Sequence, residues 1–445
     1  MRSFLLFLIR KLLYYVPARW YRSQRAATKM FSRKDAGHPS DRQLLNTVLA
    51  LMTIGLVMVY ASSVARAGRH VAANHDLFFK TQLQSALIGL IAMYLISRLH
   101  HSIIRSLASF GLLLGIALLI ATYLFGVQSH GARRWLVAGP LRFQSSELIK
   151  IVWINYIALY LSRPEINPRE LKLRQYGWLL LPLLIISAAL GLQPDFGSIV
   201  ICATLFGGLL YLAGVPFRHL LIPALVIPPI AFFVLSLKYS HLTRRISEFQ
   251  FSLFGEGVTS YNLKQALIGF GRGNWFGVGL GQSHQKMDFL PEAHTDFIFD
   301  IYGEEFGFAG VLALVGLYIY FLLRGMQIAR NASGEYEALL CAGLVCSISF
   351  QSIVNMCMAI GVLPTKGLTL PFISYGGSSL LITCCATGVI LGISRRREPG
   401  KFDRKCLYWL SLISARLPAW MRDKKTSRSR QVAYTQLEIQ RRKKK

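Results

Sequence analysis

Long apolar stretches recur along this chain of 445 residues and constrain its fold more than any other feature. Each is long enough to cross a bilayer as a helix, for which about 20 residues suffice. Hydrophobic residues make up 53% of the chain and charged residues 16%, proportions typical of a membrane protein with many spans. The short alternating segments that build membrane β-barrels are not found. The sequence therefore predicts an all-α polytopic membrane protein with ten transmembrane helices, at about residues 44–64, 82–98, 104–126, 146–162, 176–192, 197–214, 219–237, 295–323, 337–361 and 373–394.

Lysine and arginine gather at the two ends of the chain and predict its orientation. Ten of them lie in the first 42 residues and seventeen follow Ser394, and cytoplasmic segments are enriched in these residues. Both termini are therefore expected in the cytoplasm, which agrees with an even number of spans. We divide the chain into a basic N-terminal segment (1–43), a membrane domain (44–394) with a large extracytoplasmic loop (238–294) between the seventh and eighth helices, and a basic tail (395–445).

The net charge of +29 follows from these basic ends and does not indicate a nucleic-acid partner. At the N-terminus, Arg10 and Lys11 interrupt a short apolar stretch and no small-residue cleavage site follows. We expect an amphipathic helix at the membrane surface there, rather than a removable signal peptide. For the tail, contacts with anionic lipids and docking of a partner are both open. The seven cysteines show no metal-ligand spacing, so neither disulfides nor a structural metal are expected.

Five carboxylates stand at the front of the predicted eighth helix, in LPEAHTDFIFDIYGEEFG at 290–307: Glu292, Asp296, Asp300, Glu304 and Glu305. A charged side chain inside a membrane helix costs about 2.5–3.5 kcal/mol on insertion scales, so acids there indicate function. On a helix, Asp296, Asp300 and Glu304 share one face. The alternative is that Thr295 and Asp296 cap the helix and the glutamates pair with neighbouring helices. Glu305 is nearly opposite Asp296 and needs a separate partner.

Cations that could face these acids lie in the predicted outer segments. Arg133 and Arg134 stand at the outer surface, where guanidinium groups can hold phosphate through paired hydrogen bonds. Glu147 and Lys150 can form an ion pair at the top of the fourth helix, either serving a site or joining helices. The large loop adds further polar residues, Arg244, Arg245, Gln265 and Arg272, with GFGRGNWFGVGLGQ at 269–282, whose glycines suit a folded loop rather than another span.

Two breaks between predicted helices also carry polar residues. Asp195 lies in LQPDFGS and can cap the sixth helix. GVLPTKGLTLPFISYGGSS at 361–379 is interrupted by prolines and glycine and contains Lys366 and Ser374. Irregular backbone at this depth is tolerated only inside protein or beside a water-filled cavity, so Lys366 is expected to face an anionic ligand or a carboxylate in such a cavity. Together, the acids and cations predict an outward-facing pocket for an amphipathic, phosphorylated lipid, served by an enzyme or by a transporter.

Five segments resemble the SEDS family of bacterial shape, elongation, division and sporulation proteins. They are PEAHTDFIF at 291–299, GEEFG at 303–307, LPTKGLTLPFISYGGSS at 363–379, QPDFGS at 193–198 and ARRW…QSSELIK at 132–150. The similarity extends over about residues 44–395, and LPTKGLTLP is closer to the division branch than to the elongation branch. The resemblance implies a ten-helix peptidoglycan glycosyltransferase that polymerises lipid II on the outer face of the bacterial cytoplasmic membrane. It also implies a partner, a single-span class B penicillin-binding transpeptidase of the divisome.

The resemblance further implies roles for single residues. Asp296 matches the family's essential aspartate, and Glu292 matches an acidic loop residue linked to activation. Lys366, Glu147 and Lys150 match other functional positions.

The chain departs from the family pattern at two positions. Ser145 replaces a proline before the fourth helix, which bears on where that helix starts. Asp300 stands where a small apolar residue is expected, so a second acid lies one turn from Asp296 and competes with it for the role of base.

A mechanism consistent with these residues is an inverting glycosyl transfer with Asp296 as general base toward the 4-hydroxyl of lipid II. The leaving pyrophosphate would be neutralised by cations drawn from Lys366, Arg133, Arg134, Arg244 and Arg245, or by a divalent metal. No cofactor other than such a cation is expected. A lipid II flippase and a non-catalytic scaffold for the transpeptidase are the alternatives. The polar residues gather in the predicted outer half, which favours an enzyme over a transport path that reaches both sides.

Overall fold

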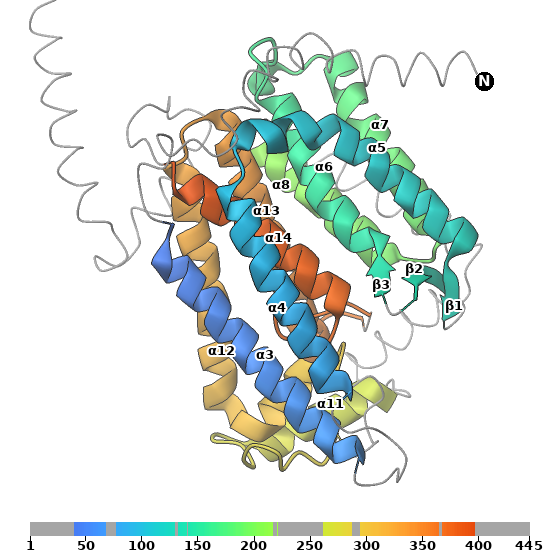
Figure 1. Ribbon diagram of the computed structural model, residues 1–445, viewed down its shortest axis with the longest axis vertical. Helices are drawn as coiled ribbons and strands as arrows, with labels where there is room; N and C mark the ends of the chain where they lie inside the picture. Colours follow the sequence, from blue (N-terminus) through green and yellow to red (C-terminus); the bar gives the residue numbers. More distant parts are fainter. Residues whose placement is uncertain are drawn as a thin grey trace, which may run out of the picture.

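The computed structural model describes residues 40–396 except for 68–76, 130–131, 140, 217–219, 221–260, 287–293 and 365–366. Nine long helices of this part of the chain pack into one bundle (Figure 1). They are α3 (Arg42–Ala67), α4 (Leu77–Arg98), α5 (His101–Phe125), α6 (Ser145–Leu161), α7 (Leu173–Leu192), α8 (Phe196–Leu212), α12 (Ile298–Arg330), α13 (Glu335–Ala359) and α14 (Gly377–Ser394). Seven of them are long and apolar enough to cross a membrane, and α6 and α8, with 17 residues each, are shorter. The protein is thus a polytopic membrane protein built of helices.

The beginning of α3 and the end of α14 meet at one end of the bundle, which we call the tail end. The backbone N–H of Asp41 donates a hydrogen bond of 3.0 Å to Ser394 Oγ. The Asp41 carboxylate also forms an ion pair of 2.7 Å with Arg324 of α12. We call the opposite end, where α12 and α14 begin, the loop end. Both ends of the membrane domain therefore lie on one side of the bundle.

Nine of the predicted spans coincide with these helices, with bounds that differ by a few residues. The last helix begins at Gly377 rather than at 373, because the preceding residues form turns that start at the Leu370 carbonyl. The predicted span 219–237 lies outside the described residues apart from Leu220. The N-terminal segment up to residue 39 and the tail from residue 397 also lie outside them.

A small antiparallel sheet between α5 and α6 departs from the all-α expectation. Its strands are β1 (Val127–Ser129), β2 (Ala132–Ala138) and β3 (Leu141–Gln144), paired in the order β1-β2-β3. Gly139 has a φ of 60°, which allows the tight turn between β2 and β3. Strands of 3–7 residues are too short to stand out beside the apolar spans, so the sequence pattern did not predict them.

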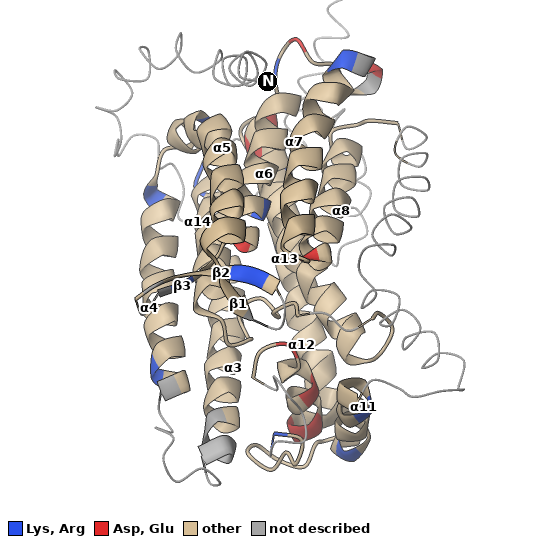
Figure 2. Cartoon of the chain, turned by 90° about the vertical axis from the view of Figure 1, so that its right-hand side faces the viewer, with Lys and Arg blue, Asp and Glu red and all other residues tan. Residues whose placement is uncertain are grey.

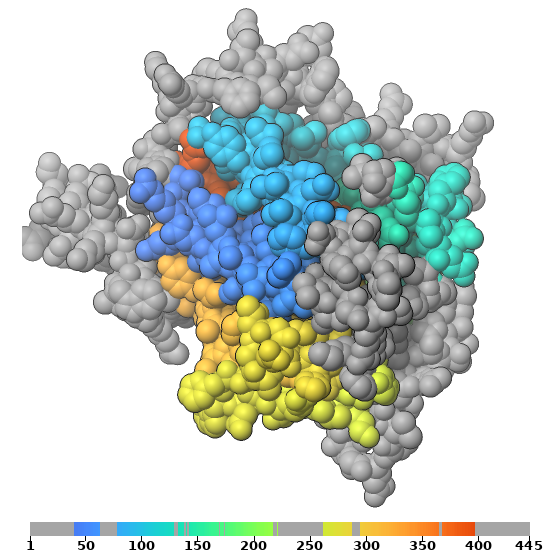
Figure 3. Space-filling model, turned by 60° about the horizontal axis from the view of Figure 1, so that its bottom comes forward, coloured from blue at the N-terminus to red at the C-terminus, as the bar shows by residue number. Residues whose placement is uncertain are grey.

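The large loop contributes an amphipathic helix, α11 (Tyr261–Gly273), at the loop end beside the start of α12. Seen from that end, α11 and the glycine-rich segment after it form one surface next to α3 and α12 (Figure 3). A single turn of 3-10 helix, η2 (Pro168–Glu170), connects α6 to α7 at the other end. The expectation that the glycine-rich segment is a folded loop and not a span is confirmed.

This loop packs against a break in α12. Gly307 has φ 65° and ψ −167°, so α12 consists of two helices that meet there. Four hydrogen bonds of 2.9–3.1 Å join the backbone of residues 274–279 to that of residues 304–309. Gly277 and Gly307 face each other so closely that a β-carbon on either would collide with the opposite backbone. The loop therefore satisfies the backbone groups that the break leaves open, which a helix entering a membrane requires.

Candidate functional site

Asp296 lies in a turn before α12, not on the helix itself. The helix begins at Ile298 with Phe297 at the N-cap position, so the alternative in which Thr295 and Asp296 cap it is wrong. Asp296 is partly buried, and its Oδ2 lies beside Gly367, where a β-carbon would be only 3.1 Å from that oxygen. The aspartate thus lies against the irregular segment between α13 and α14 at the residue after Lys366, which itself lies outside the described residues.

The segment of residues 367–376 is held against Asp296 by two amide side chains of α13. Gln351 Nε2 donates a hydrogen bond of 3.0 Å to the Thr369 carbonyl. Asn355 Nδ2 donates to the carbonyl of Leu368 (2.6 Å) and to that of Asp296 (3.1 Å). Because both amides are buried, they determine how closely the two segments approach each other.

Ser374 has a structural role in the same segment. Its Oγ accepts a hydrogen bond of 2.7 Å from Leu370 N, and its carbonyl accepts one of 3.3 Å from Gln82 Nε2 of α4. Gln82 Oε1 in turn accepts a hydrogen bond of 3.2 Å from Gly376 N. Ser374 is 4% exposed, so it supports the loop and does not line an open surface.

An aromatic cluster joins this segment to the residues before Asp296. The backbone N–H of Tyr375 donates a hydrogen bond of 3.0 Å to the His294 carbonyl, and the Tyr375 ring contacts those of His294 and Phe78. Burial raises the pKa of Tyr375, while a hydrogen bond with Thr81 and the positive charge of Arg142 on β3 oppose the shift. The charge of Arg142 on β3 therefore acts on Tyr375.

Glu147 and Lys150 form the predicted ion pair, with 2.9 Å between Lys150 Nζ and Glu147 Oε2. Only 3% of the lysine side chain and 8% of the glutamate side chain are exposed. Lys150 Nζ also donates a hydrogen bond of 2.6 Å to Gln351 Oε1. The pair is thus connected through Gln351 to the Thr369 carbonyl in the 367–376 segment.

The acids on α12 lie near the beginning of this helix, where they are red in Figure 2, and their contacts differ. Glu304 accepts hydrogen bonds from Ser283 Oγ and from the backbone N–H groups of His284 (3.1 Å) and Gln285 (3.3 Å), and it lies 3.5 Å from Arg272. Glu305 forms an ion pair of 2.8 Å with Lys286. The alternative in which these glutamates pair with neighbouring helices is met only in part: Arg272 lies on α11, and the other partners lie in the segment that follows α11.

Asp300 is 1% exposed, and neither of its carboxylate oxygens has a hydrogen-bond partner in the described structure. It is therefore buried in the protein, whereas Asp296 is partly accessible. The row of three acids predicted for one helical face divides into an accessible aspartate, a buried aspartate and a glutamate that anchors a loop.

The predicted phosphate-binding arginines differ in their contacts. Arg134 donates from Nε to the Gln193 carbonyl at 3.4 Å and from Nη2 to the Pro194 carbonyl, which holds the turn between α7 and α8. Arg133 is exposed and makes one long contact of 3.4 Å with the Leu124 carbonyl. Gln265 is partly buried on α11. Three other predicted site residues, Arg244, Arg245 and Glu292, lie outside the described residues.

Two other predicted positions have local roles. Asp195 caps α8, accepting from Ser198 N at 3.3 Å and from Ser198 Oγ at 2.7 Å, as the sequence predicts. Ser145 begins α6 and accepts a hydrogen bond of 2.8 Å from Thr122 Oγ1 of α5, so the departure from proline does not displace the start of this helix.

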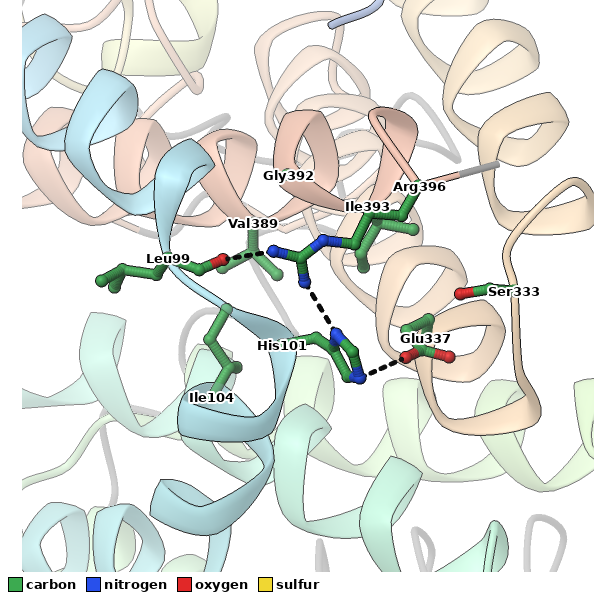
Figure 4. A pocket seen from close by; sticks show the side chains of 9 residues that line it. All are labelled: Leu99, His101, Ile104, Ser333, Glu337, Val389, Gly392, Ile393 and Arg396. Carbon is green, nitrogen blue, oxygen red and sulfur yellow. Dashed lines mark hydrogen bonds and ion pairs between the residues drawn. The ribbon is translucent and has the colours of Figure 1, made fainter. Parts of the chain in front are cut away.

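A second polar cluster lies at the tail end (Figure 4). The Arg396 guanidinium bonds His101 Nδ1 at 2.7 Å and the Leu99 carbonyl at 3.4 Å, and His101 Nε2 lies 3.5 Å from Glu337. These contacts tie the end of α14 to the beginnings of α5 and α13. The cluster is at the opposite end of the bundle from Asp296.

Two further points concern metal binding and the residues that the sequence analysis did not identify. In the described ranges, no three His, Cys, Asp or Glu side chains lie close enough to hold a metal ion. Sequence reasoning missed Gln351 and Asn355, although two amides four residues apart in an apolar helix are a signal that could have found them. It also missed Lys286, whose partner is distant in sequence.

The chain matches known proteins over most of its length. Residues 42–399 match the profile of FtsW, RodA and SpoVE, described as cell cycle protein. A probable peptidoglycan glycosyltransferase FtsW of Saccharophagus degradans is 40% identical over 375 residues, which cover 81% of this chain and 95% of that relative.

Solved structures agree with this match. The rod shape determining protein RodA of Thermus thermophilus has a TM-score of 0.59 at 27% identity, over 80% of this chain and 97% of that one. A chain from a peptidoglycan synthase complex, described as coordinating polymerization and crosslinking, has a TM-score of 0.65 at 26% identity, over 80% of this chain and 98% of that one. The resemblance of the motifs to the SEDS family is thus confirmed by an independent comparison of sequence and fold, and the chain belongs to the FtsW, RodA and SpoVE family of cell cycle proteins.

Proposed function

We propose that this chain polymerises lipid II into glycan strands at the division septum, with Asp296 as general base. Relatives that are 37–40% identical over most of the chain are named probable peptidoglycan glycosyltransferases, and this chain is an enzyme of that class. The observation that carries the role of Asp296 is the approach of its carboxylate to Gly367, in a partly buried turn at the loop end. This position leaves the carboxylate accessible and brings it next to the residue that follows Lys366.

The neighbouring acids are poor candidates for the same role. A general base must come within hydrogen-bond distance of the proton that it removes. Asp300 is 1% exposed, and Glu304 and Glu305 are 0% and 1% exposed with partners from the outer loop. We therefore assign the base to Asp296 and not to the second aspartate one turn away.

In the proposed reaction Asp296 takes the proton of the 4-hydroxyl of an incoming lipid II. The oxygen of that hydroxyl forms a bond to the anomeric carbon of the growing glycan. The bond from this carbon to the pyrophosphate oxygen breaks with inversion, and undecaprenyl pyrophosphate leaves as the anion. A glycosidase has to protonate a departing alcohol with a second acid, but a pyrophosphate is a weak base, so one carboxylate suffices.

Positive charge must offset the charge that develops on the pyrophosphate. We assign this to Lys366 and Arg133, with Arg244 and Arg245 as further candidates from the large loop. Arg134 already donates to two carbonyls and has less capacity for a ligand. A divalent cation would supply charge of the same sign, but the described carboxylates and histidines offer no cluster for one.

The proposed orientation places the loop end outside the cell and the tail end in the cytoplasm. Its support is the excess of lysine and arginine at the two termini, since residues 41 and 394 meet at the tail end. In this orientation Asp296 faces the cell wall, where lipid II is consumed. The proposed partner is a class B penicillin-binding transpeptidase, and its support is the similarity to a chain of a peptidoglycan synthase complex.

The test is polymerisation of labelled lipid II by the purified full-length chain, alone and with the transpeptidase. Asp296→Asn should lower turnover by about 100-fold or more, the range of a lost general base. Asp300→Asn has the same chemistry one turn away and should retain turnover within about threefold of the parent. Normal turnover of Asp296→Asn would refute the assignment. Leaflet exchange without glycan would indicate a flippase, and tight transpeptidase binding with neither activity would indicate a scaffold.

A further inference from the structure

Asn355 of α13 bonds the two backbone segments that meet at the site. One amide nitrogen, Nδ2, lies 3.1 Å from the carbonyl oxygen of Asp296 and 2.6 Å from that of Leu368. The side chain is 1% exposed, so water does not compete for these contacts. We propose that Asn355 is a positioning residue of the transferase, which fixes the Asp296 carboxylate beside Gly367 by holding both carbonyls. This inference rests on the proposed function of Asp296.

The chemistry of the position selects asparagine. Two carbonyl acceptors require two N–H donors on one short side chain, and a primary amide supplies both. The opposite orientation of the amide would place Oδ1 against two carbonyl oxygens, so the contacts themselves determine which atom is the nitrogen. In the described structure Oδ1 is buried and has no hydrogen-bond partner. An unpaired buried acceptor is unfavourable, and the two donated hydrogen bonds are what asparagine contributes here.

The two carbonyl acceptors of Asn355 lie next to the Asp296 carboxylate and to Gly367. One carbonyl belongs to Asp296 itself, and Leu368 follows Gly367 directly in the chain. The Asp296 carboxylate packs so closely on Gly367 that a β-carbon there would lie 3.1 Å from Oδ2. Loss of the amide would therefore let the carboxylate move relative to the 367–376 segment. A misplacement of about 1 Å near reacting groups can cost about 100-fold in rate.

Gln351, one turn earlier on α13, provides a comparison. Its Nε2 bonds the Thr369 carbonyl at 3.0 Å and its Oε1 accepts from Lys150 at 2.6 Å. These contacts hold the 367–376 segment but do not include Asp296. Among the side chains of α13 with described hydrogen bonds, Asn355 is therefore the one that couples the proposed base to this segment.

The experiment measures lipid II polymerisation and thermal unfolding of the full-length chain carrying Asn355→Ala. The matched control is Asn155→Ala, because Asn155 is a buried asparagine at the tail end whose Nδ2 donates to the Ile104 carbonyl at 2.9 Å and whose Oδ1 accepts from Tyr336 at 2.7 Å. We expect Asn355→Ala to lower kcat 10- to 100-fold with KM changed less than about threefold. Asn155→Ala should lower the melting temperature about as much as Asn355→Ala does, but its kcat should equal that of the parent.

The combined effect of substitutions at Asn355 and Gly367 on kcat distinguishes a positioning role from a purely structural one. Gly367→Ala should lower kcat by crowding Asp296, and its effect should be non-additive with Asn355→Ala because both act on one distance. With Asn155→Ala the effects should multiply independently. If Asn355→Ala does not fold, Asn355→Leu keeps a branched side chain of similar shape, removes the amide donors without adding a charge and should show the same loss of kcat.

The outcomes separate this inference from the function on which it rests. Parental kcat in a folded Asn355 variant, or full independence from Gly367→Ala, overturns the positioning role and leaves the transferase intact. Absence of glycan from the parent chain with its transpeptidase would overturn both. A fall in kcat that is coupled to Gly367 supports the proposal.

Discussion

Lys286 and Glu305 form an ion pair of 2.8 Å that is almost fully removed from solvent, with 2% and 0% of their side chains exposed. Lys286 lies at the end of the described glycine-rich loop, and Glu305 precedes the break at Gly307. The adjacent Glu304 accepts two backbone hydrogen bonds from the same loop. Two neighbouring glutamates therefore attach the loop to the short helix that follows Asp296. Glu304 and Glu305, which the sequence analysis considered as members of a functional site, instead determine the path of the chain near Asp296.

Replacing Lys286 with methionine should destabilise the protein strongly. Glu305 would remain buried without its counter-charge, and breaking a buried pair from one side costs about 3–5 kcal/mol. Thermal unfolding in detergent micelles measures the effect. The double variant Lys286→Met with Glu305→Gln should recover most of the loss. The control is Lys264→Met on the exposed face of α11, which should change stability by less than about 0.5 kcal/mol; an equal loss there would show that the ion pair is not responsible.

Gly307→Ala should also destabilise the chain, and Gly316→Ala in the same helix should not. Gly307 has a φ of 65°, and a β-carbon would collide with the backbone of Gly277. With a ψ of −167°, this backbone conformation is essentially restricted to glycine and costs alanine about 1–3 kcal/mol. Gly316 has helical backbone and open space around its α-carbon, so alanine there should stabilise by about 0.5–1 kcal/mol. Equal melting temperatures of the two variants would contradict the role of the break.

The spans were predictable because hydrophobic length is a strong signal that each segment carries by itself. Nine predicted spans match helices on this basis. The break at Gly307 was not predictable, because it depends on residues 274–279, which lie about thirty positions earlier and supply the hydrogen bonds that a continuous helix would make. The predicted continuity from 295 onward assumed that Asp296 shares the helix of Asp300, and the N-cap at Phe297 shows that it does not.

The candidate site was predictable in its residue types but less so in their roles. Asp296, Asp195 and the Glu147–Lys150 pair were identified from charges in apolar surroundings, which is a local signal. Whether a charge is accessible or buried depends on neighbours from other helices. Asp296 could not be distinguished from Asp300 by sequence, because only the packing around α12 makes one accessible and the other buried.

The Glu147–Lys150 pair should act as support for the 367–376 segment. Lys150→Met leaves Glu147 buried alone and removes a hydrogen bond to Gln351, so stability should fall by about 3–5 kcal/mol and turnover should fall with it. Adding Glu147→Gln removes the unpaired charge and should restore most of the stability and part of the turnover. Thermal unfolding and lipid II polymerisation measure both. A double variant that is fully stable but inactive would instead assign Lys150 to the substrate.

Arg133 and Arg134 are adjacent on β2 but should respond differently to substitution, because Arg134 donates to two carbonyls whereas the exposed Arg133 makes one long contact. Arg134→Ala removes the donors to the Gln193 and Pro194 carbonyls, and two lost hydrogen bonds from a charged group predict a loss of about 3 kcal/mol or more in stability. Arg133→Ala removes an exposed guanidinium and should leave the melting temperature unchanged. If Arg133 neutralises the pyrophosphate, the Arg133→Ala variant should have a KM for lipid II that is several-fold higher than that of the parent. This increase in KM should be smaller at high salt, where exposed charges are screened. An unchanged KM for Arg133→Ala would leave Lys366 and the arginines of the large loop as the source of that charge.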